Sequence, residues 1–278
     1  MSIQSGSERS AGYLSRLSTI VSAWASQLVS SPSEPHRAEA AQRLARQVMT
    51  IVVVAAIAIP ILMVSFDARE IALMPPRGTA SLWPFRVLTD FGKDTYVLLL
   101  LLVLMVLVTL VTPALRGPRM RWLLTIGLRL QFLFLAVSVP LVLGELLKWI
   151  AGRGRPFVGG QANAFNFVPF AGSEAHASFP SAHTITAFAL AVAIAAIWPR
   201  LRGLMIAYAL LIVFTRLVLL AHHPSDVMAG AAIGMVGAIW VRYWFAVRRL
   251  GFAVDDHGVI WTAVHQPPKG VAAGASGP

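Results

Sequence analysis

The chain has no cysteine among its 278 residues, and only 13% of its residues are charged. The lack of cysteine excludes disulfides, thiolate catalysis and cysteine-ligated metals. Soluble domains carry about 25% charged residues, whereas 57% of this chain is hydrophobic. The composition therefore favours a polytopic membrane protein with one membrane domain and a short segment at each end.

Acidic residues are also scarce, since 12 Asp and Glu stand against 23 Lys and Arg, for a formal net charge of +11. In a membrane protein such an excess fixes the orientation, contacts anionic headgroups or binds an anionic substrate. The basic residues are scattered between apolar runs and form no continuous stripe, so nucleic acid is not expected as a partner. The expected partners are the phospholipid bilayer and an anionic ligand, and the sequence gives no indication of oligomeric state.

Six apolar segments come close to the roughly 20 residues that cross a bilayer. They are 47–66, 94–112, 121–147, 182–198, 203–221 and 226–247. The predicted fold class is therefore all-α: a polytopic membrane bundle of six transmembrane helices within residues 47–247. Residues 1–46 are predicted as a cytoplasmic or interfacial segment, 67–93 as a polar loop, and 248–278 as a cytoplasmic tail.

Apolar residues of the N-terminal segment recur on one face of a possible helix. These are Tyr13, Leu14, Leu17, Ile20, Val21, Trp24 and Leu28. The spacing fits an amphipathic helix lying on the membrane surface, and the polar composition around it fits a poorly ordered tail equally well. The fold prediction includes the amphipathic helix.

Lys and Arg residues between the predicted spans set the expected orientation. More of them fall in the segments that share a side with the two termini, so the positive-inside rule places both termini in the cytoplasm. Six spans then bring three polar clusters to the outer, periplasmic face of a bacterial inner membrane. Ionisable groups near a bilayer are costly, which makes these clusters candidates for function. The clusters are Lys148 to Pro156, Pro180-Ser181-Ala182-His183, and Thr215-Arg216 with His222 and Asp226.

Three cations of these clusters, Lys148, Arg155 and Arg216, can converge on one small anion. The arginine fork matches phosphate oxygens, and lysine supplies a point charge. The Ser181 hydroxyl and the backbone N–H groups near Ala182 lie at a predicted helix start, where free donors and the helix dipole favour anions. Together these groups predict a phosphate site that needs no metal and no cofactor.

Two histidines and one carboxylate fit phosphoryl transfer at such a site. His222 can attack phosphorus and form a phosphohistidine. Asp226 can hold the proton on the other ring nitrogen of His222 and so fix its tautomer. His183 can protonate the leaving oxygen and then activate water. Each residue alone also fits an ordinary interfacial side chain, and it is their joint spacing that favours a site.

Three side chains near the clusters keep two interpretations each: Glu145, His176 and His223. Glu145 either pairs with Lys148 one turn away or supports the site from behind. His176 either touches substrate or is solvated in its loop. His223 competes with His222 for the nucleophile, but its position before Pro224 favours a structural role at a helix start.

The clusters, in this order and spacing, resemble the signature of the type 2 phosphatidic acid phosphatase superfamily, K-x6-R-P, P-S-G-H and S-R-x5-H-x3-D. The resemblance covers roughly residues 94–247 and departs at two positions, where Ala182 replaces glycine and Thr215 replaces serine. A positive φ at Ala182 would strain an alanine. The resemblance implies a helical core, metal-independent chemistry, His183 as the acid and His222 as the nucleophile.

The sequence thus predicts an integral membrane lipid phosphatase acting on a lipid phosphate or diphosphate at the outer face. Candidate substrates are undecaprenyl diphosphate, placed first, phosphatidylglycerophosphate, phosphatidic acid and the phosphate of lipid A. A lipid-to-lipid phosphotransferase using the same residues is one alternative, which product analysis distinguishes. A non-catalytic lipid transporter or scaffold is another.

Overall fold

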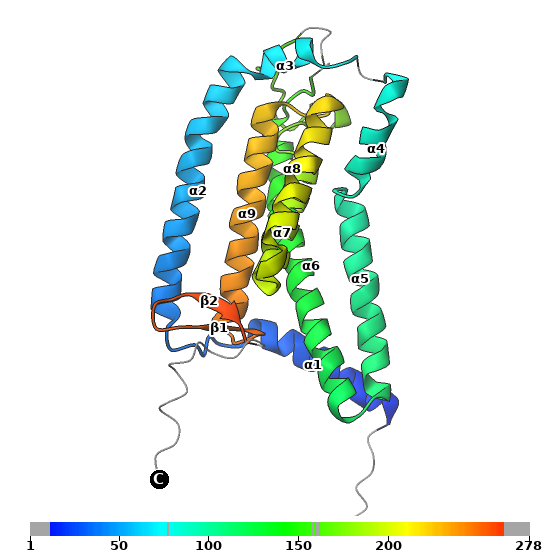
Figure 1. The fold of residues 1–278 in the computed structure, drawn as a ribbon, viewed down its shortest axis with the longest axis vertical. Helices are drawn as coiled ribbons and strands as arrows, with labels where there is room; N and C mark the ends of the chain where they lie inside the picture. Colours follow the sequence, from blue (N-terminus) through cyan, green and yellow to red (C-terminus); the bar gives the residue numbers. More distant parts are fainter. Residues whose placement is uncertain (1–11, 77, 157, 159–161, 264–278) are drawn as a thin grey trace, which may run out of the picture.

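Long helices running in alternate directions form the body of the molecule in the computed structural model (Figure 1). The structure describes residues 12–76, 78–156, 158 and 162–263. The helices are α1 (Tyr13–Val29), α2 (Arg37–Ser65), α3 (Asp67–Leu73), α4 (Trp83–Asp90), α5 (Asp94–Val111), α6 (Gly117–Ala151), α7 (Ala182–Ile197), α8 (Arg202–Val218) and α9 (Pro224–Ala246). Short 3₁₀ turns are η1 (Ala80–Leu82), η2 (Thr112–Ala114), η3 (Glu174–His176) and η4 (Pro199–Leu201), and the strands are β1 (Phe252–Val254) and β2 (Ile260–Thr262). The predicted all-α membrane fold is confirmed.

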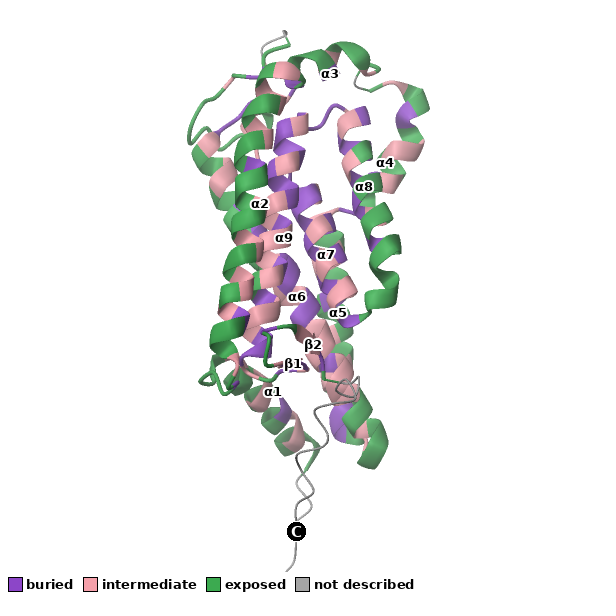
Figure 2. Cartoon of the chain, turned by 60° about the vertical axis from the view of Figure 1, so that its left-hand side comes forward, coloured by how far each residue is buried: buried purple, intermediate pink, exposed green. Residues whose placement is uncertain are grey.

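Five of the described helical stretches are long and apolar enough to cross a membrane. α7 is also apolar but has only 16 residues, so the count of six spans stays a prediction. α2 and α5 are mostly exposed, whereas α7 is mostly buried and α9 is about half buried between the other helices (Figure 2). Many exposed positions of α2 and α5 carry Val, Ile or Leu, as a lipid-facing surface requires.

α7 and α9 pack with their backbones in direct contact. A Cβ atom on Gly234 would lie 2.4 Å from the carbonyl oxygen of Ile185, and one on Gly230 would lie 2.7 Å from that of Ser181. Only glycine permits this approach, which brings the starts of the two helices together. The backbone N–H of Ser181 donates to the carbonyl of Asp226 over 3.1 Å. The second and third sequence clusters are joined directly by this bond.

The segment 67–93 is not the polar loop predicted from the sequence, because it contains α3, η1 and α4. Asp67 in α3 is fully buried and its carboxylate accepts a hydrogen bond from the backbone of Ser225 over 3.1 Å. Phe85 in α4 packs edge-on against Phe214 of α8, with ring centroids 5.8 Å apart. Inward-facing polar and aromatic residues therefore organise this segment, and their partners lie far away in the sequence.

The end of the bundle opposite the clusters is covered by α1 and the β1–β2 hairpin. The Tyr13 hydroxyl donates to the Leu110 carbonyl over 2.7 Å, and the Trp244 indole N–H donates to the Leu28 carbonyl over 3.1 Å. These bonds and the buried Ile20 show that α1 is a packed helix and not a poorly ordered tail. The hairpin was missed within the predicted tail, whose residues 264–278 lie outside the described part of the chain.

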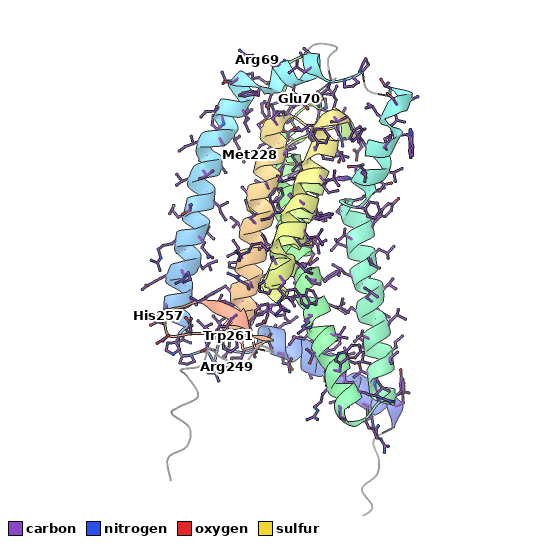
Figure 3. All side chains as sticks on the ribbon, viewed as in Figure 1. Arg69, Glu70, Met228, Arg249, His257 and Trp261 are labelled. Carbon is purple, nitrogen blue, oxygen red and sulfur yellow. The ribbon has the colours of Figure 1, made fainter. Side chains whose placement is uncertain are left out.

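The two ends of the molecule carry different polar residues (Figure 3). Arg249, His257 and Trp261 lie at the end that holds the hairpin, while Arg69 and Glu70 of α3 lie at the end that holds the three clusters. The predicted segment boundary at residue 46 falls inside α2, which runs without interruption from Arg37 to Ser65. The N-terminal segment and the membrane bundle are therefore continuous through this helix.

Candidate active site

The three sequence clusters meet at one end of the bundle, where α6 and α8 end and α7 and α9 begin (Figure 1). Gly152 ends α6 with φ of +54°. A Cβ atom there would lie 1.8 Å from the carbonyl oxygen of Val168, so this left-handed turn requires glycine. The turn directs the first cluster away from α6 and over the starts of α7 and α9.

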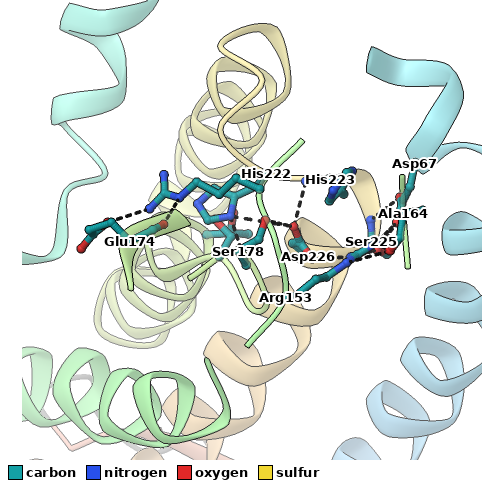
Figure 4. Close-up of polar contacts among 12 residues, drawn as sticks. Asp67, Arg153, Ala164, Glu174, Ser178, His222, His223, Ser225 and Asp226 are labelled. Carbon is teal, nitrogen blue, oxygen red and sulfur yellow. Dashed lines mark hydrogen bonds and ion pairs between the residues drawn. The ribbon is translucent and has the colours of Figure 1, made fainter. Parts of the chain in front are cut away.

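His222 lies buried in the turn between α8 and α9. Its Nδ1 atom is 2.8 Å from the carbonyl oxygen of Ser178 (Figure 4). A carbonyl can only accept a hydrogen bond, which assigns the ring proton to Nδ1 and leaves a lone pair on Nε2. A neutral imidazole with a free Nε2 is the form that can attack phosphorus.

The surroundings of His222 keep its ring neutral. Burial lowers the pKa of His222 well below its usual value, and the positive charges of Arg216 and Arg155 lower it further. The hydrogen bond to Ser178 acts in the opposite direction without reversing the shift. The nucleophilic form of the ring therefore predominates at neutral pH.

Asp226 does not make the direct hydrogen bond to His222 that the sequence analysis expected. Its Oδ2 atom is 4.0 Å from Nδ1 of His222 and instead accepts from the Ser178 hydroxyl over 2.6 Å and from the His223 backbone N–H over 2.9 Å. Its Oδ1 atom accepts from Nη1 of Arg153. Asp226 thus holds Ser178, and the carbonyl of Ser178 accepts the hydrogen bond from the Nδ1–H of His222 (Figure 4).

Two of the three predicted phosphate-binding cations share one cavity. Arg155 and Arg216 line a cavity of about 370 Å³ together with Arg86 of α4. Arg155 pairs with Glu174 over 3.1 Å, and Nη1 of Arg216 donates to the Thr89 hydroxyl over 3.0 Å. Three guanidinium groups, those of Arg86, Arg155 and Arg216, border one cavity and fit a phosphate in geometry and charge.

Lys148 lines a neighbouring cavity of about 240 Å³ and forms an ion pair with Glu145. This ion pair corresponds to the first interpretation of Glu145, in which it pairs with Lys148 one turn away. Glu174 and His176 border the same cavity. The Glu174 side chain is 95% exposed, and Nδ1 of His176 lies 3.1 Å from the Ser173 hydroxyl.

The second cluster forms the start of α7. Ser181 is fully buried, and its hydroxyl oxygen accepts from the Thr184 hydroxyl over 3.0 Å, which leaves its own hydrogen for another acceptor. Ala182 is the first residue of α7 and is not among the positive-φ residues of the described chain, so replacing the family glycine causes no strain there. The charges of Arg216 and Arg155 act on the half-buried ring of His183, which places this ring beside the same cations as His222.

His223 is the N-cap of α9, directly before its first residue Pro224, as its structural interpretation expected. Its backbone N–H donates to Oδ2 of Asp226. Burial lowers the pKa of His223. The catalytic and phosphate-binding roles of the predicted residues stay predictions.

Three side chains at this end of the bundle were not predicted from the sequence to take part in the site. Arg153 lies inside the first cluster, but no role was assigned to it there. Ser178 lies two residues before Pro180 and outside the second cluster. Asp67 carried no signal beyond following an apolar span. All three are fully buried, and burial of polar groups is visible only once their partners are known.

Glu70 is a buried carboxylate next to this site. Within the described part of the chain neither of its carboxylate oxygens has a hydrogen-bond partner. Burial, followed by the negative charges of Asp67 and Asp226, raises the pKa of Glu70 from 4.5 to about 8. Glu70 is therefore largely protonated at neutral pH.

Replacing Glu70 by glutamine is expected to stabilise the protein more at pH 8 than at pH 5. The pKa of Glu70 is raised in the folded protein. Between pH 4.5 and about 8 the folded protein therefore keeps a proton on Glu70 that the unfolded chain has released. The free energy of unfolding consequently falls as the pH rises through this window. Glutamine removes that dependence. We expect the Glu70→Gln variant to melt about 3 °C higher than wild type at pH 8 and no higher at pH 5.

Thermal melts of purified protein in detergent at both pH values measure this difference. The exposed Glu39 of α2 supplies the matched control. Glu39→Gln makes the same chemical change at a carboxylate that is in water and not buried. An equal effect of Glu70→Gln at both pH values would show that Glu70 is ionised throughout.

These features define a class of protein: a helical membrane protein with a neutral buried histidine, a buried carboxylate and a cavity lined by three arginines at one end of its bundle. The PAP2 superfamily matches residues 129–250, which include all three clusters. The chain belongs to the PAP2 superfamily, the type 2 phosphatidic acid phosphatases that its motifs resemble.

Three bacterial relatives are similar over parts of the chain. A lipid A 1-phosphatase of Rhizobium johnstonii is 39% identical over 127 residues, covering 46% of this chain and 52% of that relative. A lipid A 1-phosphatase of Rhizobium etli is 34% identical over 181 residues, covering 64% of this chain and 76% of that relative. The putative undecaprenyl-diphosphatase YbjG of Escherichia coli is 30% identical over 113 residues, covering 38% and 54%. The chain thus spans about half the length of the first of these relatives, 52%.

No solved structure matches the chain. The apolar helices and the membrane lipid phosphatases among its relatives indicate a bacterial membrane protein.

Proposed function

We propose that this protein is a lipid phosphatase that hydrolyses the phosphate of a glycolipid of the lipid A type. The observation that carries the proposal is the neutral His222, whose Nδ1 proton is held by Ser178 while Arg155 and Arg216 border the adjacent cavity. Two relatives named lipid A 1-phosphatase support this substrate over the polyprenyl diphosphate that the sequence analysis placed first. One relative named for undecaprenyl diphosphate keeps that lipid in the test.

The proposed reaction has two steps. In the first, Nε2 of His222 attacks phosphorus and the bond from phosphorus to the lipid oxygen breaks. His183 enters this step as an imidazolium, stabilised by the negative charge of the bound phosphate, and gives the lipid oxygen its proton. In the second, His183 takes a proton from water, the water oxygen attacks the phosphohistidine, and the P–N bond breaks to release inorganic phosphate. Arg155 and Arg216 stabilise the charge on the equatorial oxygens in both steps.

The orientation belongs to the same proposal. All three clusters lie at one end of the bundle, and α1 and the hairpin lie at the other (Figure 1). We place the cluster end at the periplasmic face and both termini in the cytoplasm, as the distribution of Lys and Arg favours. The phosphate is then reached from the outer leaflet, where the lipid chains remain in the bilayer.

A phosphate-release panel on the purified full chain in detergent tests the proposal. The substrates are lipid A 1-phosphate, undecaprenyl diphosphate, phosphatidylglycerophosphate and phosphatidic acid. We expect fastest release from lipid A 1-phosphate, no loss of rate with EDTA, and inhibition by orthovanadate, which adopts five-coordinate geometry as the transferring phosphoryl group does. Phosphorylated acceptor lipid in place of free phosphate would identify a phosphotransferase, and a strict Mg²⁺ requirement would contradict the metal-independent mechanism.

A further inference from the structure

Arg153 lies at the centre of a buried ion network beneath the site (Figure 4). Its side chain is fully buried, as are those of Asp67 and Asp226. Nη2 of Arg153 donates to Oδ2 of Asp67 over 2.7 Å, and Nη1 donates to Oδ1 of Asp226 over 2.5 Å. Nε and Nη2 also donate to the carbonyl of Ala164 over 3.2 Å and 2.7 Å. The guanidinium therefore bridges two buried carboxylates that come from different parts of the chain.

Asp67 holds the start of α9 by a second route. Its Oδ1 atom accepts from the Ser225 backbone N–H over 3.1 Å, and its Oδ2 atom accepts from the Ser225 hydroxyl over 2.5 Å. The Ser225 hydroxyl oxygen in turn accepts from Nη1 of Arg153 over 2.7 Å. Asp67 thus contacts the residue before Asp226 and the cation that neutralises Asp226.

The network continues to the proposed nucleophile through Ser178. Asp226 accepts from the Ser178 hydroxyl over 2.6 Å, and the Ser178 backbone N–H donates to the carbonyl of Arg153 over 3.0 Å. These two bonds fix the peptide whose carbonyl accepts from Nδ1 of His222. A displaced Ser178 carbonyl would rotate the His222 ring and move Nε2 relative to the cavity.

We propose that Asp67 is a positioning residue for His222, acting through Arg153, Asp226 and Ser178. The inference rests on the proposed function, and it adds a residue of α3, which lies outside the 129–250 region that matches the superfamily. Breaking a buried charge pair from one side leaves the other charge uncompensated. With Asp67 neutralised, Arg153 is balanced by Asp226 alone and is drawn toward it, which displaces the Ser178 hydroxyl from Oδ2.

The test compares Asp67→Asn with wild type in the phosphate-release assay. A misplacement of about 1 Å costs on the order of 10²-fold in rate, so we expect kcat to fall about 10–100-fold. KM should change less than about threefold, because Arg155 and Arg216 keep their own partners. Glu70→Gln is the matched control. Glu70 lies in the same helix as Asp67, and its buried carboxyl makes no hydrogen bond to a described residue. The Glu70→Gln variant should therefore keep the wild-type kcat.

A double-mutant cycle separates positioning from general loosening of the fold. Ser178→Ala removes the hydroxyl that joins Asp226 to the Ser178 peptide, so its effect on kcat should overlap with that of Asp67→Asn and the combined loss should be smaller than the product. The proposal would be overturned if the double variant lost the full product of the two single losses. It would also be overturned if kcat were unchanged in Asp67→Asn, or if Glu70→Gln lost as much kcat as Asp67→Asn. If Asp67→Asn does not fold, Ser225→Ala replaces it with an expected loss in kcat of about fivefold, and no loss overturns the proposal.

A measurement without substrate keeps this inference distinguishable from the proposed function. ¹⁵N shifts of the His222 ring report which nitrogen carries the proton. We expect the Nδ1–H tautomer in wild type and in Glu70→Gln, and a mixture of both tautomers in Asp67→Asn. An unchanged tautomer overturns the positioning role, whereas an inactive wild type with the expected shifts would count against the proposed function alone.

Discussion

The His222→Ala variant is expected to lose at least about 10³-fold in kcat, since removing the nucleophile of a covalent mechanism removes the first step. The loss should fall on kcat and not on lipid binding, because Arg155 and Arg216 border the cavity independently of the imidazole. Phosphate release from lipid A 1-phosphate measures kcat, and sedimentation with lipid A 1-phosphate vesicles measures binding.

The neighbouring histidine supplies the matched control. His223 holds Asp226 through its backbone N–H, and asparagine is a favoured residue at a helix start. His223→Asn should therefore keep most of the wild-type rate. Loss of rate in His223→Asn together with a working His222→Ala would reassign the nucleophile to His223.

A quench experiment shows whether a phosphohistidine forms. Wild-type protein mixed with ³²P-labelled lipid should carry an acid-labile, alkali-stable label, and His222→Ala should carry none. A labelled His222→Ala variant that turns over would contradict the mechanism regardless of the rates.

The sequence predicted the site where its chemistry depends on local spacing. His222 and Asp226 lie in a short turn and the first turn of α9, so their separation in sequence nearly determines their separation in space. The span lengths then bring the clusters to one end of the bundle, because each apolar run crosses the same thickness. The structure brings Arg155, Arg216 and His183 to this end of the bundle, as the spacing predicted, and their roles stay predictions.

The rest of the site depends on contacts that spacing does not contain. Asp67 and Arg153 are 86 residues apart, and their pairing exists only because α3 folds back over α9. Spacing also favoured Asp226 as the acceptor for His222, whereas the structure uses the Ser178 carbonyl. Every residue has a backbone carbonyl, so sequence cannot show which one will accept a hydrogen bond from a given side chain. The hairpin of β1 and β2 was missed for a similar reason, since three-residue strands carry no periodicity.

His183 has a separate expected effect that depends on the leaving group. If His183 protonates the lipid oxygen, His183→Asn should lower kcat on lipid A 1-phosphate by about 10²–10⁴-fold, the usual range for general acid catalysis. On p-nitrophenyl phosphate the first step should be nearly unaffected, because nitrophenolate leaves as an anion without a proton.

The second step separates protonation from positioning. Hydrolysis of the phosphohistidine still needs a base to activate water, so His183→Asn should release about one nitrophenolate per protein in a fast burst and then turn over slowly. His176 lies in η3 beside the neighbouring cavity, and His176→Asn should show wild-type rates on both substrates. An equal loss on both substrates without a burst would mean that His183 orients the phosphate and that another group carries the proton. The burst is therefore the decisive readout for the second step, because loss of the base that activates water slows hydrolysis of the phosphohistidine without slowing its formation.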